Sequence, residues 1–77
     1  MNYASGEKVR VGDSVCINTQ YQGIVVAVID DGQYSKEYTE EQWSYLKSGL
    51  IIDTDFGGIV HYQESDILDE QMELKNE

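Results

Sequence analysis

The chain has 77 residues, and its 15 acidic and 5 basic side chains give a formal net charge of -10. This excess of negative charge repels phosphate, so it argues against direct binding of nucleic acid or an anionic membrane and favours a protein partner with a basic surface. One cysteine and one histidine exclude an internal disulfide and a Cys/His zinc site, and we expect no cofactor. We therefore expect a single cytoplasmic domain over 1–77, as a monomer or a homodimer.

The first third of the chain predicts a frayed lead-in followed by β structure. Residues 1–7 are small and polar, which is typical of a loose terminus. Apolar side chains then alternate with polar ones on both sides of a Gly-Asp turn, which predicts a strand or a pair of strands on one core. The side chains expected to face that core are Val9, Val11, Val15 and Ile17.

The central strand is predicted at 23–29, where an apolar and largely β-branched run stops at Asp30-Asp31-Gly32. An Asp-Gly pair favours a hairpin turn. The partner strand should therefore begin directly after the turn, with Tyr34 and Tyr38 as its aromatic positions.

A short helix is predicted at 40–47. Thr39 and Gln42 have the spacing of a capping box, and Tyr38 and Trp43 have that of a hydrophobic staple. Acidic residues in the first turn and a lysine in the last turn both suit the helix dipole.

Gly49 fits the left-handed position after that helix. The apolar stretch 50–52 then predicts a strand, and the glycine-containing stretch 53–58 predicts a turn. A second strand at 59–62 completes a second hairpin.

The C-terminal part of the chain is predicted to contain little regular structure. Residues 64–66 fit a single helical turn, and 67–68 fit a last short strand. The stretch 69–77 is acidic and polar, and we expect it to form a loose, flexible tail or a weak helix that orders on a partner.

Two runs of sequence carry a resemblance to a known fold. The pattern V-x-V-G-D-x-V at 9–15, followed by G-x-V-V at 23–26, resembles the SH3-like barrels of small bacterial proteins. The resemblance implies a mainly β, five-stranded SH3-like barrel interrupted by the helix at 40–47. Such barrels often serve translation or transcription, but the basic face of their RNA-binding members is missing here.

No group of residues predicts catalysis or metal binding. Cys16 and His61 are the only candidates for a nucleophile and its base, and no third residue is suggested to orient them. Asp53-Thr54-Asp55 begins like a calcium loop but lacks the remaining ligands of such a loop. We therefore expect a protein that is not an enzyme.

The aromatic and acidic residues together suggest a surface that binds another protein. Exposed Tyr side chains bury a large area at a low entropic cost, and nearby carboxylates attract basic groups. The residues expected to form this surface are Tyr34, Tyr38, Tyr45, Tyr62, Glu40, Glu41, Asp53 and Asp55.

Two functions remain open at this point. The first is a non-enzymatic, acidic protein-protein interaction module. The second is an acidic immunity or inhibitor protein, of a toxin or phage system, which covers the basic site of a nuclease or another nucleic-acid enzyme with carboxylates.

Overall fold

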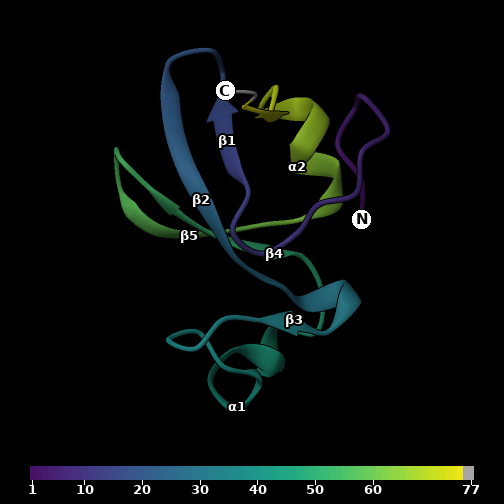
Figure 1. The fold of residues 1–77 in the computed structure, drawn as a ribbon, viewed down its shortest axis with the longest axis vertical. Coiled ribbons are helices and arrows are strands. Elements are labelled where there is room, and N and C mark those ends of the chain that lie inside the picture. The colour runs from purple at the N-terminus through teal and green to yellow at the C-terminus, as the bar shows by residue number, and fades with distance from the viewer. Residues whose placement is uncertain (76–77) are drawn as a thin grey trace.

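A computed structural model describes residues 1–75. The strands and helices follow one another along the chain as Figure 1 shows. The strands are β1 (Ser14–Ile17), β2 (Tyr21–Val28), β3 (Gln33–Tyr34), β4 (Leu50–Thr54), β5 (Gly58–Tyr62) and β6 (Glu73–Leu74). The helices are α1 (Glu40–Trp43) and α2 (Glu64–Asp69), and short 3-10 turns span Ile29–Asp31 and Ser44–Leu46.

The strands form one antiparallel sheet in the order β5-β4-β2-β1-β6, with β3 paired to the end of β2. The prediction of a mainly β fold is confirmed, as are the hairpins β2–β3 and β4–β5. The sheet is open, because β5 and β6 stand at its two ends and do not pair within residues 1–75. A closed five-stranded barrel is therefore not seen: α2 and the N-terminal segment cover the core in place of a closing strand (Figure 1).

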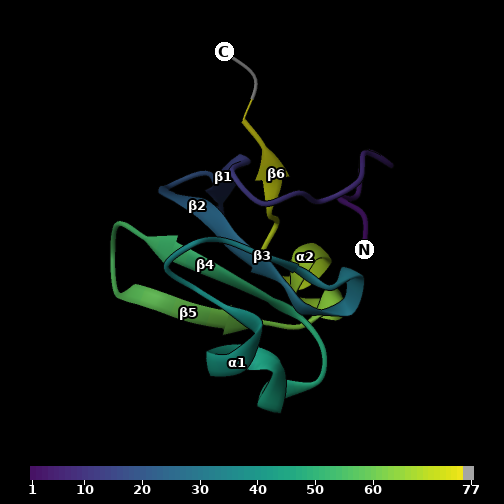
Figure 2. The ribbon, with the colours of Figure 1, turned by 60° about the horizontal axis from the view of Figure 1, so that its bottom comes forward.

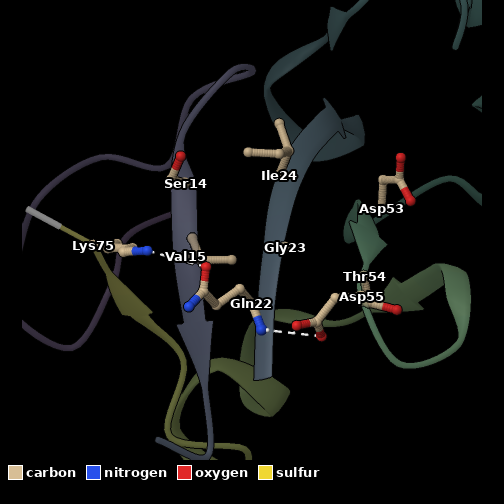
Figure 3. A pocket seen from close by; sticks show the side chains of 9 residues that line it. All are labelled: Ser14, Val15, Gln22, Gly23, Ile24, Asp53, Thr54, Asp55 and Lys75. Atoms are coloured by element: carbon tan, nitrogen blue, oxygen red, sulfur yellow. Dashed lines mark hydrogen bonds between the residues drawn. The ribbon is translucent and has the colours of Figure 1, made fainter. Parts of the chain in front are cut away.

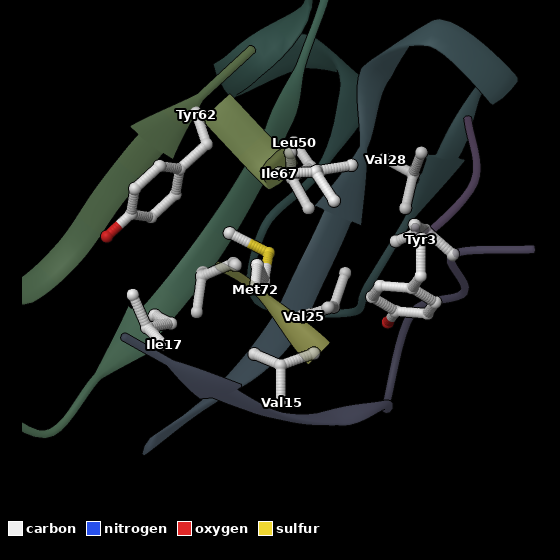
Figure 4. Close-up of a cluster of buried hydrophobic side chains, with 11 residues drawn as sticks. Tyr3, Val15, Ile17, Val25, Val28, Leu50, Tyr62, Ile67 and Met72 are labelled. Carbon is white, nitrogen blue, oxygen red and sulfur yellow. The ribbon is translucent and has the colours of Figure 1, made fainter. Parts of the chain in front are cut away.

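The main core lies on one face of the sheet, which we call the inner face (Figure 4). Alternate residues of the strands point to it, as the period of two requires. Val9, Val15 and Ile17 are buried there as predicted, and the partly buried Val11 packs against them. The other buried members are Tyr3, Val25, Val28, Leu50, Ile52, Tyr62, Ile67 and Met72.

The N-terminal segment is ordered, which corrects the expectation of a frayed lead-in. Tyr3 is buried in the main core, and its backbone N–H donates to the carbonyl of Glu7 at 2.9 Å. The N–H of Val9 donates to the carbonyl of Met1 at 3.0 Å. One isolated large ring among small polar residues gives no periodic signal, so its burial could not be predicted from pattern.

The C-terminal part is also more regular than predicted. Residues 64–69 form α2 rather than a single turn and a strand, because Gln63 and Asp66 build a reciprocal capping box at its start. Beyond α2, Met72 is only 1% exposed, and β6 pairs with β1. The prediction of a loose tail is therefore wrong for 72–75, while 76–77 lie outside the described residues.

The helix predicted at 40–47 is present as α1 followed directly by the turn Ser44–Leu46. Thr39 is the N-cap residue, although its side chain makes no capping hydrogen bond. The chain leaves the turn through Lys47, whose φ of 66° gives it the left-handed position directly after the helical segment. Gly49, for which that position was predicted, follows two residues later and also has a positive φ, 97°.

A second, smaller cluster lies on the opposite face of the sheet, which we call the outer face. Trp43 and Leu46 pack there against Ala27, Ile29 and Ile51. The segment that carries α1 therefore covers only one end of the outer face (Figure 2). No helix within residues 1–75 has the length and apolar character needed to cross a bilayer.

Candidate protein-binding site

A row of side chains crosses the outer face where α1 does not cover it. Ile24 on β2 pairs with Asp53 on β4, and Asp53 pairs with Ile59 on β5. Residues directly opposite in neighbouring strands point to the same face, so the three side chains form one row. Ile24 is 43% exposed, Ile59 is 37% exposed, and Asp53 is exposed between them. This row is the centre of the candidate site.

A depression lies on one side of the row and is lined by β1, β2 and the end of β4 (Figure 3). Gln22 links its walls: its N–H donates to Asp55 Oδ1 at 3.2 Å, and its Oε1 accepts from Lys75 Nζ at 3.0 Å. The N–H of Asp55 donates in turn to the carbonyl of Gln22 at 3.0 Å. Asp55 therefore extends the β2–β4 pairing, and its carboxylate has a structural role.

Asp53 differs from Asp55 in this respect. No hydrogen bond or ion pair of the Asp53 carboxylate occurs within residues 1–75. An exposed carboxylate between two exposed isoleucines can accept a cation whose aliphatic part rests on the neighbouring apolar groups.

A second depression shares Ile24 and Asp53 with the first and leads to Tyr38. From Tyr38 the aromatic rings continue along the surface: its ring centroid lies 6.2 Å from that of Trp43, which lies 6.4 Å from that of Tyr45. Tyr45 is 68% exposed. We call these three rings the aromatic chain, and it joins α1 to the row on the sheet.

Seven of the eight predicted site residues divide into three groups. Tyr38 and Asp53 line one depression, so these two are brought together. Tyr45, Glu40 and Glu41 are exposed on the segment that carries α1. Tyr34 is half-buried against the second cluster, and Asp55 is exposed but engaged with Gln22.

Tyr62 is a correction, because only 6% of it is exposed and it belongs to the main core. Burial raises the pKa of its hydroxyl, and the nearby Glu70 and Asp66 carboxylates raise it further. The alternation along β5 explains the burial, since Tyr62 shares the inner face with Val60. Tyr62 therefore offers almost no surface to a partner.

Cys16 and His61 do not meet. They lie on β1 and β5, with β2 and β4 between them, and three strand spacings separate them by about 14 Å. His61 Nε2 donates to the carbonyl of Ser48 at 2.8 Å, so the imidazole ties the chain before β4 to β5.

The stretch that begins like a calcium loop is a turn held by Thr54. Its hydroxyl donates to the carbonyl of Gly58 at 2.7 Å and accepts from the N–H of Gly57 at 3.2 Å. Within residues 1–75, no three His, Cys, Asp or Glu side chains gather as they would to hold a metal ion.

Pattern reasoning missed Ile24 and Ile59, the apolar members of the row. The unbroken apolar run around Ile24 predicted a central strand but did not indicate which side chains stay exposed, and α1 covers only the far end of β2. Residues along β5 alternate between the two faces, so Ile59 and His61 point away from the face that carries Val60 and Tyr62. This alternation was the signal that could have placed Ile59 on the outer face.

Comparisons with protein families, with curated proteins and with solved structures found no match for this chain.

Proposed function

We propose that this chain is a non-enzymatic, acidic protein-binding domain that uses the outer face of its sheet and the adjoining aromatic chain. The observation that carries the proposal is the exposed row of Ile24, Asp53 and Ile59, which continues into Tyr38. Exposed apolar groups next to an unpaired carboxylate and exposed rings suit a protein surface with basic and apolar side chains. The proposal includes a family assignment, namely that the chain is related to the SH3-like barrels of small bacterial proteins.

The charge of the chain supports a basic partner. Glu37, Glu40 and Glu41 are exposed close to the aromatic chain, and the formal net charge is -10. Opposite potentials speed the encounter of two proteins, and exposed rings such as Tyr45 then add contact area.

Cross-linking in a native lysate, followed by mass spectrometry, tests the proposal. The wild-type chain is compared with Tyr45→Ala and with the double variant Glu40→Lys/Glu41→Lys. A partner that cross-links to 36–47 or to the outer face, and that both variants lose, supports the proposal. Equal recovery of every partner by all three chains contradicts it.

The second candidate is an inhibitor that covers the basic site of a nucleic-acid enzyme. The three exposed glutamates of 37–41 favour it, because closely spaced carboxylates can occupy positions where such an enzyme binds phosphates. It predicts a tight complex with a nuclease or a related enzyme whose affinity falls steeply with salt. Cross-links to a partner without nucleic-acid activity would exclude this candidate and leave the first.

A further inference from the structure

Strand β5 is an edge of the sheet, and its outer side pairs with no other strand among residues 1–75. Within residues 1–75 it pairs only with β4, and no backbone hydrogen bond from its other side is present for 59–61. In an edge strand, alternate N–H and C=O groups point away from the sheet and can pair with another extended chain. Figure 2 shows β5 along the margin of the sheet, next to β4.

The usual protections of an edge strand are missing from β5. Natural edges are kept free by charged residues, prolines, bulges or very short length. The five residues Gly58–Tyr62 include no Asp, Glu, Lys, Arg or Pro, and their pairing with β4 is continuous. The edge strands β3 and β6, in contrast, have only two residues each. Among the strands of residues 1–75, β5 is therefore the longest edge strand without a charged residue.

We propose that β5 accepts an extended basic segment of a partner protein as an additional antiparallel or parallel strand. This inference rests on the proposed function and names its mode of binding. The new strand would extend the row Ile24–Asp53–Ile59 by one residue on the outer face. A lysine or arginine opposite Ile59 lays its aliphatic stem along that side chain and directs its charge toward Asp53.

The spacing of the sheet is consistent with this contact. Asp53 and the new residue would be two strands apart, which is about 10 Å between their backbones. A long cationic side chain and a carboxylate that point toward each other from these positions can close that gap across Ile59. Since successive residues alternate between faces, the partner segment should carry its basic residues at every second position.

Charge also decides between the two occupants that an open edge can take. A second copy of this chain would bring another formal net charge of -10 to the same edge, whereas a basic segment neutralises part of it. We therefore assign the edge to a partner segment and treat self-pairing as a competing outcome.

The test uses an acetylated, amidated seven-residue peptide that alternates lysine and valine, with a glutamate-for-lysine peptide as control. We expect the lysine peptide alone to bind, and amide hydrogen exchange to slow within 58–62. Two N-methylated forms of the peptide, methylated at odd or at even positions, should differ, because only one set of N–H groups faces β5. Asp53→Asn should weaken the Kd about threefold to tenfold, while Glu7→Gln, with the same change in charge, should change it less than twofold.

Several outcomes would overturn the inference. These are no binding of the lysine peptide, unchanged exchange at 58–62 in its presence, equal binding of both methylated forms, and a peptide-free dimer that protects the same amides. If cross-linking still places a partner on the aromatic chain in any of these cases, the proposed function stands and only the mode of binding is wrong. If the lysine peptide binds but no partner cross-links to 36–47 or to the outer face of the wild-type chain, the proposed surface is contradicted instead.

Discussion

The Tyr3 hydroxyl donates a hydrogen bond of 2.8 Å to Asp13 Oδ2. The same carboxylate oxygen accepts from the backbone N–H of Arg10 at 2.9 Å, so Asp13 links the N-terminal segment to the turn before β1. Burial raises the pKa of Tyr3 well above its ordinary value, and the hydrogen bond to Asp13 and the negative charges of Asp13 and Glu7 raise it further. This pair therefore connects the stability of the fold to pH.

Tyr3→Phe should lower the free energy of unfolding by about 1 to 2 kcal/mol at pH 7, because it removes the bond to Asp13 and keeps the ring. Urea unfolding followed by circular dichroism measures the change. Tyr34→Phe is a matched control, since no hydrogen bond of the Tyr34 hydroxyl occurs within residues 1–75, and its effect should stay within about 0.5 kcal/mol. Equal losses in the two variants would show that the bond to Asp13 does not stabilise the fold.

The stability of the wild-type chain should fall above about pH 10, where tyrosine in the unfolded chain ionises. The folded chain holds the Tyr3 proton more tightly, so its contribution is complete below that pH and is lost as the pH rises toward the folded pKa. Tyr62, whose pKa is also raised, adds to the same loss. Unfolding free energies between pH 8 and 11 should therefore decline less steeply in Tyr3→Phe than in wild type. Parallel pH profiles would refute the assignment to Tyr3.

Gly49→Ala should destabilise the fold by at least about 2 kcal/mol more than Gly12→Ala does. The two glycines have nearly the same φ, 97° and 96°, so both variants carry a similar backbone strain. Only at Gly49 would the added methyl group meet other atoms, namely the Tyr62 carbonyl oxygen and the His61 ring, whereas nothing lies within 4 Å at Gly12. Thermal and urea unfolding of the two proteins make the comparison. Similar stabilities would mean that β4 and β5 can separate at that point without cost.

Met72→Ala should cost about 2 to 4 kcal/mol, since the side chain is fully buried in the main core and its loss leaves a cavity. Leu68→Ala is the control, because Leu68 is 67% exposed and its replacement should stay within about 0.5 kcal/mol. The free energy of unfolding in urea measures both. If Met72→Ala proved as neutral as Leu68→Ala, the region after α2 would be detached from the core in solution.

Added salt should stabilise this chain. The only ion pair within residues 1–75 joins the Met1 amino group to Asp31 at 3.5 Å, so screening by salt weakens little attraction. The same screening reduces the repulsion among the 15 acidic residues, which destabilises the folded chain. Raising sodium chloride from about 0.01 M to 0.15 M should increase the free energy of unfolding by on the order of 1 kcal/mol. The double variant Glu40→Gln/Glu41→Gln should respond less, and a decrease in either protein would contradict this account.

The elements that could be predicted from sequence are those with local signals. Residues 30–32 contain the Asp-Gly pair typical of a turn, and 39–43 have the residue spacing typical of a helix start. The turn and the start of the helix were therefore both predicted at the correct positions. The helix start illustrates the limit of such signals. Thr39 is the N-cap residue, but the capping box forms at Gln63 and Asp66 instead.

What could not be predicted depends on contacts between distant segments. Tyr3 and Met72 are single apolar residues in polar surroundings, and only the assembled sheet and α2 give them a place in the core. The candidate site has the same limitation. Tyr38, Tyr45, Glu40 and Glu41 were proposed from local composition. That Ile24 lies beside Asp53, and that both share a depression with Tyr38, depends on strand pairing and on contacts between distant segments.

Trp43 is the only tryptophan of the chain, and it stands between Tyr38 and Tyr45 with its Nε1 atom buried. The tryptophan fluorescence of the protein therefore originates beside the surface where we expect a partner. Occupation of that surface changes the polarity around one indole, so an unlabelled sample can report binding through its own emission spectrum.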